Sequence, residues 1–300
     1  MRMRRRLFVT GLLALVALAP WVHAESSATF RREEDVIYGR KDGVALTMDV
    51  FKPQEPNGHG IIFIVSGGWF SAKAAISPAL YKHFIERGYT VFAVVHGSQP
   101  KFQIPEIIHD INRSVRYVRH NAAHFGIDPD HIGISGMSAG GHLSLIIGTQ
   151  GRPGDPKSPD PVDRESSAVE CVACFFPPTD FLNYGGPNTN VLGAGILGKY
   201  RPAFGNIPDD ADLRERYGKS ISPIYWITTN LPPTLIVQGD ADATVPEQQA
   251  LSFQERARAL GDTVKVVIKK GAGHGWKNIQ PDLSLCADWF DLYLRGKKSQ

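Results

Sequence analysis

The sequence predicts an α/β fold in which a mostly parallel sheet carries helices on both faces. Three short apolar runs, at residues 61–65, 91–95 and 132–134, are each followed by a segment that is typical of a helix. Continuous apolar runs indicate strands that are buried on both faces, as in a parallel sheet covered by helices. Alternation of strands and helices implies right-handed crossovers between parallel strands.

The remaining elements follow in chain order and complete this pattern. Two strands flank a turn at Lys41-Asp42-Gly43, and a long amphipathic helix carries Ile107 and Ile111 on its apolar face. A stretch rich in loops at 181–225 interrupts the alternation and is predicted to form a small cap. The expected strands are 35–38, 47–51, 61–65, 91–95, 132–134, 169–176, 234–237 and 264–268, and the expected helices are 78–87, 105–121, 139–148, 246–260 and 281–295.

The first 24 residues have the order of a secretory signal peptide. Four arginines precede an apolar run at residues 7–19, and Val22-His23-Ala24 offers a small-x-small cleavage site. An uncleaved N-terminal anchor is the alternative, although the run is short for a membrane span. Residues 5–9 also resemble a twin-arginine export signal, with Arg4 where Ser or Thr is usual. We therefore expect a secreted or periplasmic protein.

Removal of this segment changes the charge of the chain. Residues 1–24 hold four arginines and no acid, so the formal net charge of +3 becomes −1. A chain with this charge gives no electrostatic reason to expect nucleic acid or anionic lipid as a partner. Residues 25–300 suit a single α/β domain, with the cap at 181–225 as an insertion.

The chain has three cysteines, and two of them have C-x-x-C spacing within an expected strand. Positions i and i+3 of a strand point to opposite faces, so Cys171 and Cys174 should not face each other. No second C-x-x-C accompanies them as a zinc site would require. Buried free thiols are favoured, and a bridge from Cys286 to Cys171 or to Cys174 stays open.

Ser138 is the candidate nucleophile. It lies at the centre of Gly-Met-Ser-Ala-Gly at residues 136–140, between an expected strand and an expected helix. A tight turn between these elements leaves room only for glycine at both flanks, strains the serine backbone and exposes its hydroxyl. A serine hydroxyl is a poor nucleophile near neutral pH, so it needs a base and an orienting carboxylate.

His274 is the expected base, because it follows the strand at 264–268 in a run that holds three glycines. His96, which also follows a strand, is the alternative. Asp242 or Asp240 after the strand at 234–237 can orient the histidine. We favour Asp242, because an Asp directly after Gly239 is well placed to brace the turn. The order Ser…Asp…His is that of the nucleophile-elbow hydrolases.

A glycine pair after the strand at 61–65 is the expected oxyanion loop. Backbone N–H groups of Gly68 and Trp69 are the expected donors, and Ala139 supplies a third at the N-terminus of the following helix. An ordinary turn is the alternative for this pair. Phe70, Tyr184 and Trp276 are candidate substrate contacts, together with Tyr200 and Phe204 of the cap. Each aromatic residue also has the alternative of packing the cap onto the domain.

On these motifs, the chain over residues 35–294 resembles an α/β-hydrolase of the secreted, lipase-like carboxylesterase group. It is similar to the feruloyl and acetylxylan esterase-like and hormone-sensitive-lipase-like families. That group usually has His-Gly-Gly where this chain has Ser66-Gly67-Gly68, and its lipase-like members tend to have Tyr-Arg where His96-Gly97 stands. Since backbone groups hold the oxyanion, Ser66 affects the hydrogen bonds that brace the loop.

The expected function is hydrolysis of a small, aromatic or acetyl ester, free or linked to a polysaccharide, through an acyl-enzyme on Ser138. Asp242 and His274 complete the triad, and no metal or organic cofactor is expected. Two alternatives remain. One is a serine peptidase related to the prolyl oligopeptidase catalytic domain, and the other is a binding protein on a hydrolase scaffold.

Overall fold

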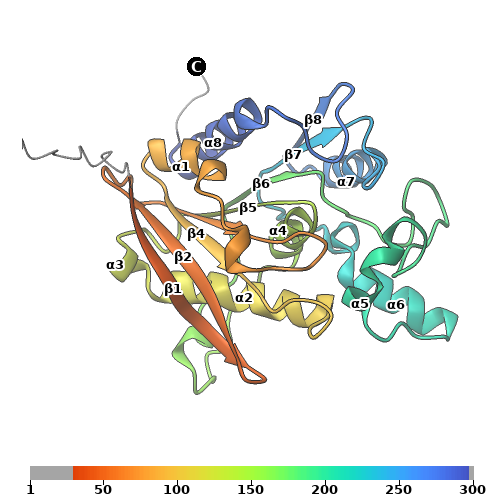
Figure 1. Cartoon of the computed structure of the whole chain (residues 1–300), viewed down its shortest axis with the longest axis horizontal. Coiled ribbons are helices and arrows are strands. Elements are labelled where there is room, and N and C mark those ends of the chain that lie inside the picture. Colours follow the sequence, from red (N-terminus) through yellow and green to blue (C-terminus); the bar gives the residue numbers. More distant parts are fainter. Residues whose placement is uncertain (1–29, 297–300) are drawn as a thin grey trace, which may run out of the picture.

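An eight-stranded sheet forms the centre of the computed structural model, which describes residues 30–296 (Figure 1). Its strand order is β1-β2-β4-β3-β5-β6-β7-β8. The strands are β1 (Phe30–Lys41), β2 (Val44–Pro53), β3 (Gly60–Ile64), β4 (Thr90–Val95), β5 (Ile132–Met137), β6 (Cys171–Phe175), β7 (Thr234–Gly239) and β8 (Val264–Lys269). The β1–β2 and β2–β4 pairs are antiparallel, and every pair from β4 to β8 is parallel. The predicted fold class is confirmed.

Helices cover both faces of the sheet. They are α1 (Lys82–Glu86), α2 (Ile104–His120), α3 (Ala122–Phe125), α4 (Ala139–Gln150), α5 (Arg201–Phe204), α6 (Ala211–Ile221), α7 (Gln248–Ala259) and α8 (Gln280–Leu294). The apolar faces of α2, α4 and α7 share one core cluster, whereas α1 and α8 belong to a second cluster on the other face (Figure 1). Within residues 30–296, no helix combines the length and the apolar character that a membrane span requires.

Side chains of β6 alternate between these two clusters. Cys174 packs in the cluster of α2 and α4, and Cys171 packs in the cluster of α8, so the two thiols lie on opposite faces as predicted. Cys286 of α8 is also buried, and all three cysteines are free. Burial raises the pKa of each thiol, which keeps these sulfurs protonated and unreactive. The expectation of buried free thiols therefore holds, and neither proposed bridge is formed.

The sequence predicts the long helices well and the short ones less well. Helix α2 begins with a capping box, in which the N–H of Gln103 donates to Glu106 at 2.9 Å. The expected helix at 78–87 is divided, because a 3₁₀ turn (Pro78–Leu80) precedes the short α1. The expected cap at 181–225 contains α5 and α6. Asp210 caps α6 by accepting a hydrogen bond from the N–H of Leu213 at 2.9 Å.

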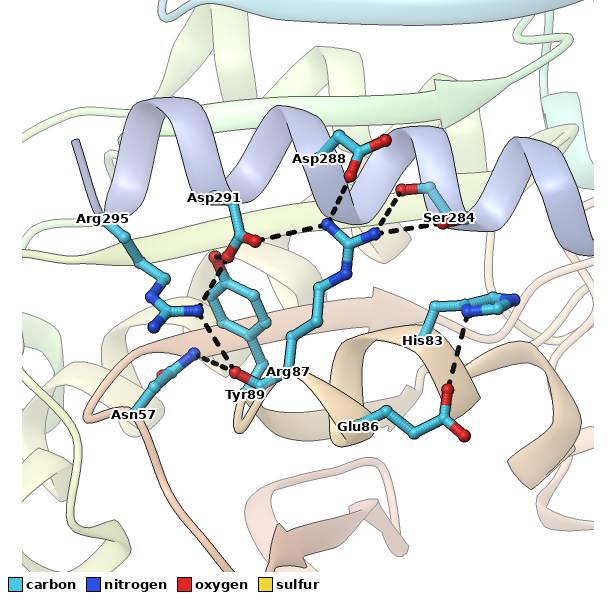
Figure 2. A network of polar contacts seen from close by, with 9 residues as sticks. All are labelled: Asn57, His83, Glu86, Arg87, Tyr89, Ser284, Asp288, Asp291 and Arg295. Carbon is cyan, nitrogen blue, oxygen red and sulfur yellow. Dashed lines mark hydrogen bonds and ion pairs between the residues drawn. The ribbon is translucent and has the colours of Figure 1, made fainter. Parts of the chain in front are cut away.

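A network of polar contacts holds α8 against α1 and the start of β4 (Figure 2). The Arg87 guanidinium contacts Asp288 at 2.6 Å and the Ser284 hydroxyl at 3.0 Å, both on α8. Tyr89 donates to Asp291 of the same helix at 2.9 Å. The Arg87 side chain is 23% exposed, so its contacts are partly shielded from water. This network fixes the C-terminal helix over the second core cluster.

We expect Arg87→Ala to lower the free energy of unfolding by about 1–3 kcal/mol, because the partners on α8 lose a charged donor. Denaturant unfolding would measure the change. Lys82→Ala in α1, the helix that Arg87 follows, is the matched control, since Lys82 forms an exposed ion pair with Glu86 at 3.8 Å. That variant should change stability by less than about 0.5 kcal/mol. Equal effects of the two substitutions would contradict the role of the network.

Candidate active site

Ser138 lies in a tight turn between β5 and α4, with φ of 53° and ψ of −117°. Positive φ is strained for a residue with a side chain, and close backbone contacts hold it there. A Cβ atom on Gly136 would lie 2.5 Å from the backbone of Gly140, and a Cβ on Gly140 would lie 2.6 Å from the Ile64 carbonyl oxygen. The N–H of Ser138 donates to the Phe175 carbonyl at 3.0 Å. Only glycine fits at both flanks.

Three side chains from the carboxyl ends of different strands meet at this turn. His274 Nε2 lies 2.9 Å from Ser138 Oγ, and His274 Nδ1 lies 2.7 Å from Asp242 Oδ2. Asp242 follows β7, and His274 follows β8. Carboxyl ends of parallel strands meet at one edge of the sheet, which brings these three residues together although up to 136 positions separate them.

Asp242 is buried and fully hydrogen-bonded. Its Oδ1 accepts the N–H groups of Thr244 at 2.8 Å and Val245 at 2.9 Å, while Oδ2 faces His274. Burial alone would raise the pKa of this carboxyl group, but the hydrogen bonds from His274 and from the two backbone groups outweigh it, and the pKa lies below its usual range. Asp242 is therefore an ionised group whose Oδ2 faces Nδ1 of His274.

Asp240, the alternative carboxylate, braces the loop instead. It accepts the N–H of Gly271 at 2.6 Å and forms an ion pair with Lys270 at 3.0 Å. Hydrogen bonding to Lys270 and to Gly271 lowers its pKa. Its partners therefore belong to the loop that carries His274 rather than to the imidazole itself.

The glycine pair after β3 forms a turn with two consecutive residues at positive φ, Gly68 at 56° and Trp69 at 60°. The turn is closed by reciprocal backbone hydrogen bonds between Gly67 and Phe70, at 2.9 and 3.0 Å. Across residues 30–296, no hydrogen bond in the structure uses the N–H of Gly68 or of Trp69. Ala139 is the first residue of α4, a position whose N–H has no acceptor within the helix.

The indole of Trp69 points into the core beneath the cap. Its Nε1–H donates to His142 Nδ1 at 3.2 Å, and its ring packs against Phe204 at 5.3 Å and Tyr200 at 6.0 Å between centroids. A Cβ on Gly68 would lie 2.2 Å from the Tyr200 ring. Tyr200 and Phe204 thus pack the cap onto the glycine turn, which is the alternative that the sequence left open for them.

The three candidate substrate contacts have different surroundings. Phe70 is 54% exposed at the end of the glycine turn. Tyr184 is buried, and its hydroxyl donates to the Thr244 carbonyl at 2.9 Å. This hydrogen bond supports the loop that carries Asp242. Trp276 is half-buried and donates to Asp282 at 2.8 Å.

Sequence reasoning missed Phe176, whose ring lies 4.6 Å from the His274 imidazole and 5.7 Å from Trp276. It has a positive φ of 36° directly after β6. Its position at the carboxyl end of a central strand was the signal that could have found it. A hollow of about 190 Å³ was also missed, and it lies beside the glycine turn. Its lining is mostly apolar and includes Met137, Ser66 and Gly67.

His96, the alternative base, bonds elsewhere. It is 3% exposed, its Nε2 lies 2.8 Å from the Ser66 hydroxyl, and its Nδ1 lies 2.7 Å from the Gly97 carbonyl oxygen. His274, and not His96, is the imidazole that contacts Ser138.

A family model described as BD-FAE matches residues 48–257, which is more than half of the sequence. The chain belongs to the BD-FAE family. This BD-FAE protein is 28% identical to an esterase, LipC, of Mycobacterium tuberculosis over 80% of its own length and 59% of that protein. It is also 31% identical to an acetylxylan esterase of Xylanibacter ruminicola over 49% of its own length and 29% of that protein. The chain spans about half the length of three curated relatives that it matches, LipC, LipM and LipQ of Mycobacterium tuberculosis.

Solved structures of esterases share the fold of this BD-FAE protein. A truncated carbohydrate esterase from gut microbiota superposes with a TM-score of 0.76 at 26% identity, covering 90% of this chain and 99% of that one. Esterase 2 of Thermogutta terrifontis superposes with a TM-score of 0.67 at 26% identity, covering 89% and 96%. The resemblance to the α/β-hydrolase carboxylesterase group is confirmed.

Two buried histidines give this BD-FAE protein a predictable response to acid. Burial lowers the pKa of His142 and of His96 from the usual 6.5 to about 4. Unfolding exposes both groups, so between pH 6.5 and 4 the unfolded state binds more protons than the folded state. Stability is therefore fully present above pH 6.5 and is lost as the pH falls toward 4.

We expect the free energy of unfolding to fall by up to about 1.4 kcal/mol per pH unit for each histidine in this window. Denaturant unfolding of the wild type and of His142→Gln between pH 7 and 4.5 tests this, because the variant should show a shallower dependence on pH. His124→Gln, on an exposed side chain, is the control and should keep the wild-type slope. An unchanged slope in His142→Gln would refute the assignment.

Proposed function

We propose that this protein is a serine carboxylesterase that works through an acyl-enzyme on Ser138. The observation that carries the proposal is the continuous hydrogen-bonded series from Ser138 through His274 to the buried Asp242, built on a strained turn. A serine hydroxyl becomes nucleophilic when an adjacent imidazole accepts its proton, and a carboxylate on the other ring nitrogen stabilises the resulting cation.

In the first step, Ser138 Oγ attacks the ester carbonyl carbon while His274 Nε2 takes the hydroxyl proton. Asp242 keeps Nδ1 protonated, so Nε2 is free to accept. The tetrahedral intermediate carries a negative oxygen, and the free N–H groups of Gly68, Trp69 and Ala139 are the proposed donors to it. Donors fixed before the reaction stabilise charge at little reorganisation cost, and removal of one costs about 10²–10³ in turnover.

In the second step, the intermediate collapses and His274 gives its proton to the departing alcohol. Water then enters, loses a proton to His274 Nε2 and attacks the acyl carbon, which returns the Ser138 hydroxyl and releases the acid. The same imidazole thus acts as base and acid in each half of the reaction.

A short acyl group is the proposed substrate feature. The hollow beside the glycine turn holds about 190 Å³, which is below the roughly 300–1,000 Å³ of pockets for drug-sized ligands. Its mostly apolar lining suits a small acyl chain such as acetyl. Names of the relatives, an acetylxylan esterase and a carbohydrate esterase, support an ester carried on a polysaccharide.

Turnover of p-nitrophenyl esters tests the acyl preference. We expect kcat/KM to be highest for acetyl to butyryl chains and at least about tenfold lower for decanoyl, because the long chain does not fit the hollow. Acetylated and feruloylated xylan extend the series to the polysaccharide. Faster turnover of decanoyl than acetyl esters would exclude this hollow as the acyl site, while leaving the reaction class intact.

We further propose that the protein is exported and that cleavage follows Ala24. The predicted signal peptide at residues 1–24 lies outside the described residues, and its order of arginines, apolar run and small-x-small site supports export. Intact-mass measurement of protein from the periplasm or medium of a bacterial host should give a chain that begins at Glu25. Full-length protein retained with the membrane would contradict the proposal.

We expect Ser138→Ala and His274→Ala each to lower kcat for p-nitrophenyl acetate by about 10⁴–10⁶-fold, and the double variant to be no worse than either single one. A fluorophosphonate probe should label the wild type and not Ser138→Ala. Absence of labelling and of ester turnover in the folded wild type would overturn the proposed function.

Two neighbouring carboxylates provide a matched pair. Asp242→Asn should lower kcat by about 10⁴-fold, because the amide favours the wrong histidine tautomer. Asp240→Asn should lose far less, since Asp240 contacts the loop and not the imidazole. Similar losses in both variants would argue against Asp242 as the orienting group.

A further inference from the structure

We propose that Ser66 and His96 form a second serine–histidine pair that positions the oxyanion loop, defined here as residues 66–71, rather than attacking substrate. This inference rests on the proposed function, because the loop matters only if its N–H groups stabilise an oxyanion. The two residues follow neighbouring strands of the sheet, Ser66 after β3 and His96 after β4. One hydrogen bond between their side chains joins the two loops.

The direction of that hydrogen bond follows from the surroundings of His96. Its Nδ1 lies 2.7 Å from the Gly97 carbonyl oxygen, which can only accept, so Nδ1 carries the proton. In a neutral ring Nε2 is then an acceptor, and it lies 2.8 Å from the Ser66 hydroxyl. The imidazole is 3% exposed, and burial favours this neutral form. Ser66 therefore donates to His96, and its oxygen lies at a fixed point.

The pair is unsuited to be a second nucleophile and base. His274 has the Asp242 carboxylate on its Nδ1, whereas His96 has only a backbone carbonyl there, which stabilises a cation far less. The charged groups beside Gly97, Asp110 and Lys41, have other partners. Asp110 accepts the N–H of Gly97 at 2.9 Å and forms an ion pair with Lys41 at 2.6 Å. The histidine is thus held as a neutral acceptor.

Further hydrogen bonds join the oxyanion loop to the segment after β4. Ser98 accepts the N–H of Ser71 at 2.7 Å and donates to the Ser71 carbonyl at 2.6 Å. The Ser71 hydroxyl donates to the Val65 carbonyl at 2.5 Å, and the N–H of Gln99 donates to the Trp69 carbonyl at 3.2 Å. The N–H of His96 also donates to the Ser71 hydroxyl at 3.2 Å. These contacts hold the loop at Trp69 and Ser71, and the hydrogen bond to His96 holds it at Ser66.

Gly68 lies between these attachments and Trp69 lies at the second of them, and both have positive φ. Glycine adopts positive φ freely, but Trp69 is strained there, and such a conformation persists only where the surrounding structure fixes it. Loss of the hydrogen bond at Ser66 leaves the start of the loop free to relax toward ordinary φ values, which turns the N–H groups away from the oxyanion. The expected effect falls on the transition state and not on substrate binding.

Variants of His96 test the pair atom by atom. Glutamine can place an acceptor near the Nε2 position, whereas asparagine reaches only the Nδ1 position. We expect His96→Asn and Ser66→Ala to lower kcat for p-nitrophenyl acetate by about 10–100-fold, with KM within about twofold of the wild type. This loss of kcat is smaller than the loss of about 10²–10³ that follows removal of an oxyanion donor itself. His96→Gln and Ser66→Thr should recover most of kcat, because each keeps the hydrogen bond. His59→Gln, at the opposite end of β3, is the control.

Two readouts separate positioning from a general structural defect. All kcat values are normalised to the sites titrated to completion by a fluorophosphonate, so misfolded molecules do not count. A trifluoromethyl ketone, whose adduct with Ser138 carries an oxyanion, should bind more weakly in Ser66→Ala by the same factor as kcat/KM falls. The variant Ser66→Ala combined with His96→Asn should lose no more than either single variant, since both break one bond.

The outcomes are distinguishable. Failure of the wild type to be labelled or to turn over esters defeats the proposed function itself. An active wild type whose Ser66→Ala and His96→Asn variants keep kcat and ketone affinity overturns this inference and leaves the proposed function intact. A loss in His96→Asn that His96→Gln does not recover, or losses that multiply in the double variant, also contradicts the pair.

Discussion

The close approach of α4 to the backbone of β3 and β5 is the constraint on which the site depends. Because Gly136 and Gly140 lack side chains, the first turn of α4 can lie against the strand ends, and Ser138 is forced to positive φ. That conformation directs Oγ toward His274 and leaves the N–H of Ala139 unpaired at the helix start. One packing contact therefore sets both the proposed nucleophile and one proposed oxyanion donor.

Support for the site comes from loops that follow neighbouring strands. The Asp242 loop is held by its own backbone N–H groups and by Tyr184 from the cap. The oxyanion loop is held by Ser66 and His96 on one side, and by the packing of Trp69 and Tyr200 on the other. Parallel topology makes this possible, since it gathers the loops after successive strands at one edge of the sheet.

The sequence predicts the sheet, the long helices and the three residues that meet at the elbow, because each leaves a local pattern: an apolar run, a helical stripe, or a glycine-flanked polar residue after a strand. Contacts between distant loops leave no such pattern. Tyr184 was expected at the surface of the site but is buried, and Tyr200 and Phe204 pack on Trp69. The contact of Phe176 with His274 and the hydrogen bond of Ser66 with His96 are seen only in the structure. Both depend on which strands are neighbours in the sheet, and no local sequence pattern gives that order.

Trp69 links the glycine turn to the cap. Its backbone belongs to the glycine turn, while its indole is enclosed by Phe181 and Phe204 of the cap and by His142 of α4. Residues of the cap are thus part of the hydrophobic core, and the cap does not form a separate layer over it. A different cap on this scaffold would have to supply aromatic side chains that enclose the indole in the same way. Substitutions in the cap are therefore best tolerated at positions that do not contact the indole.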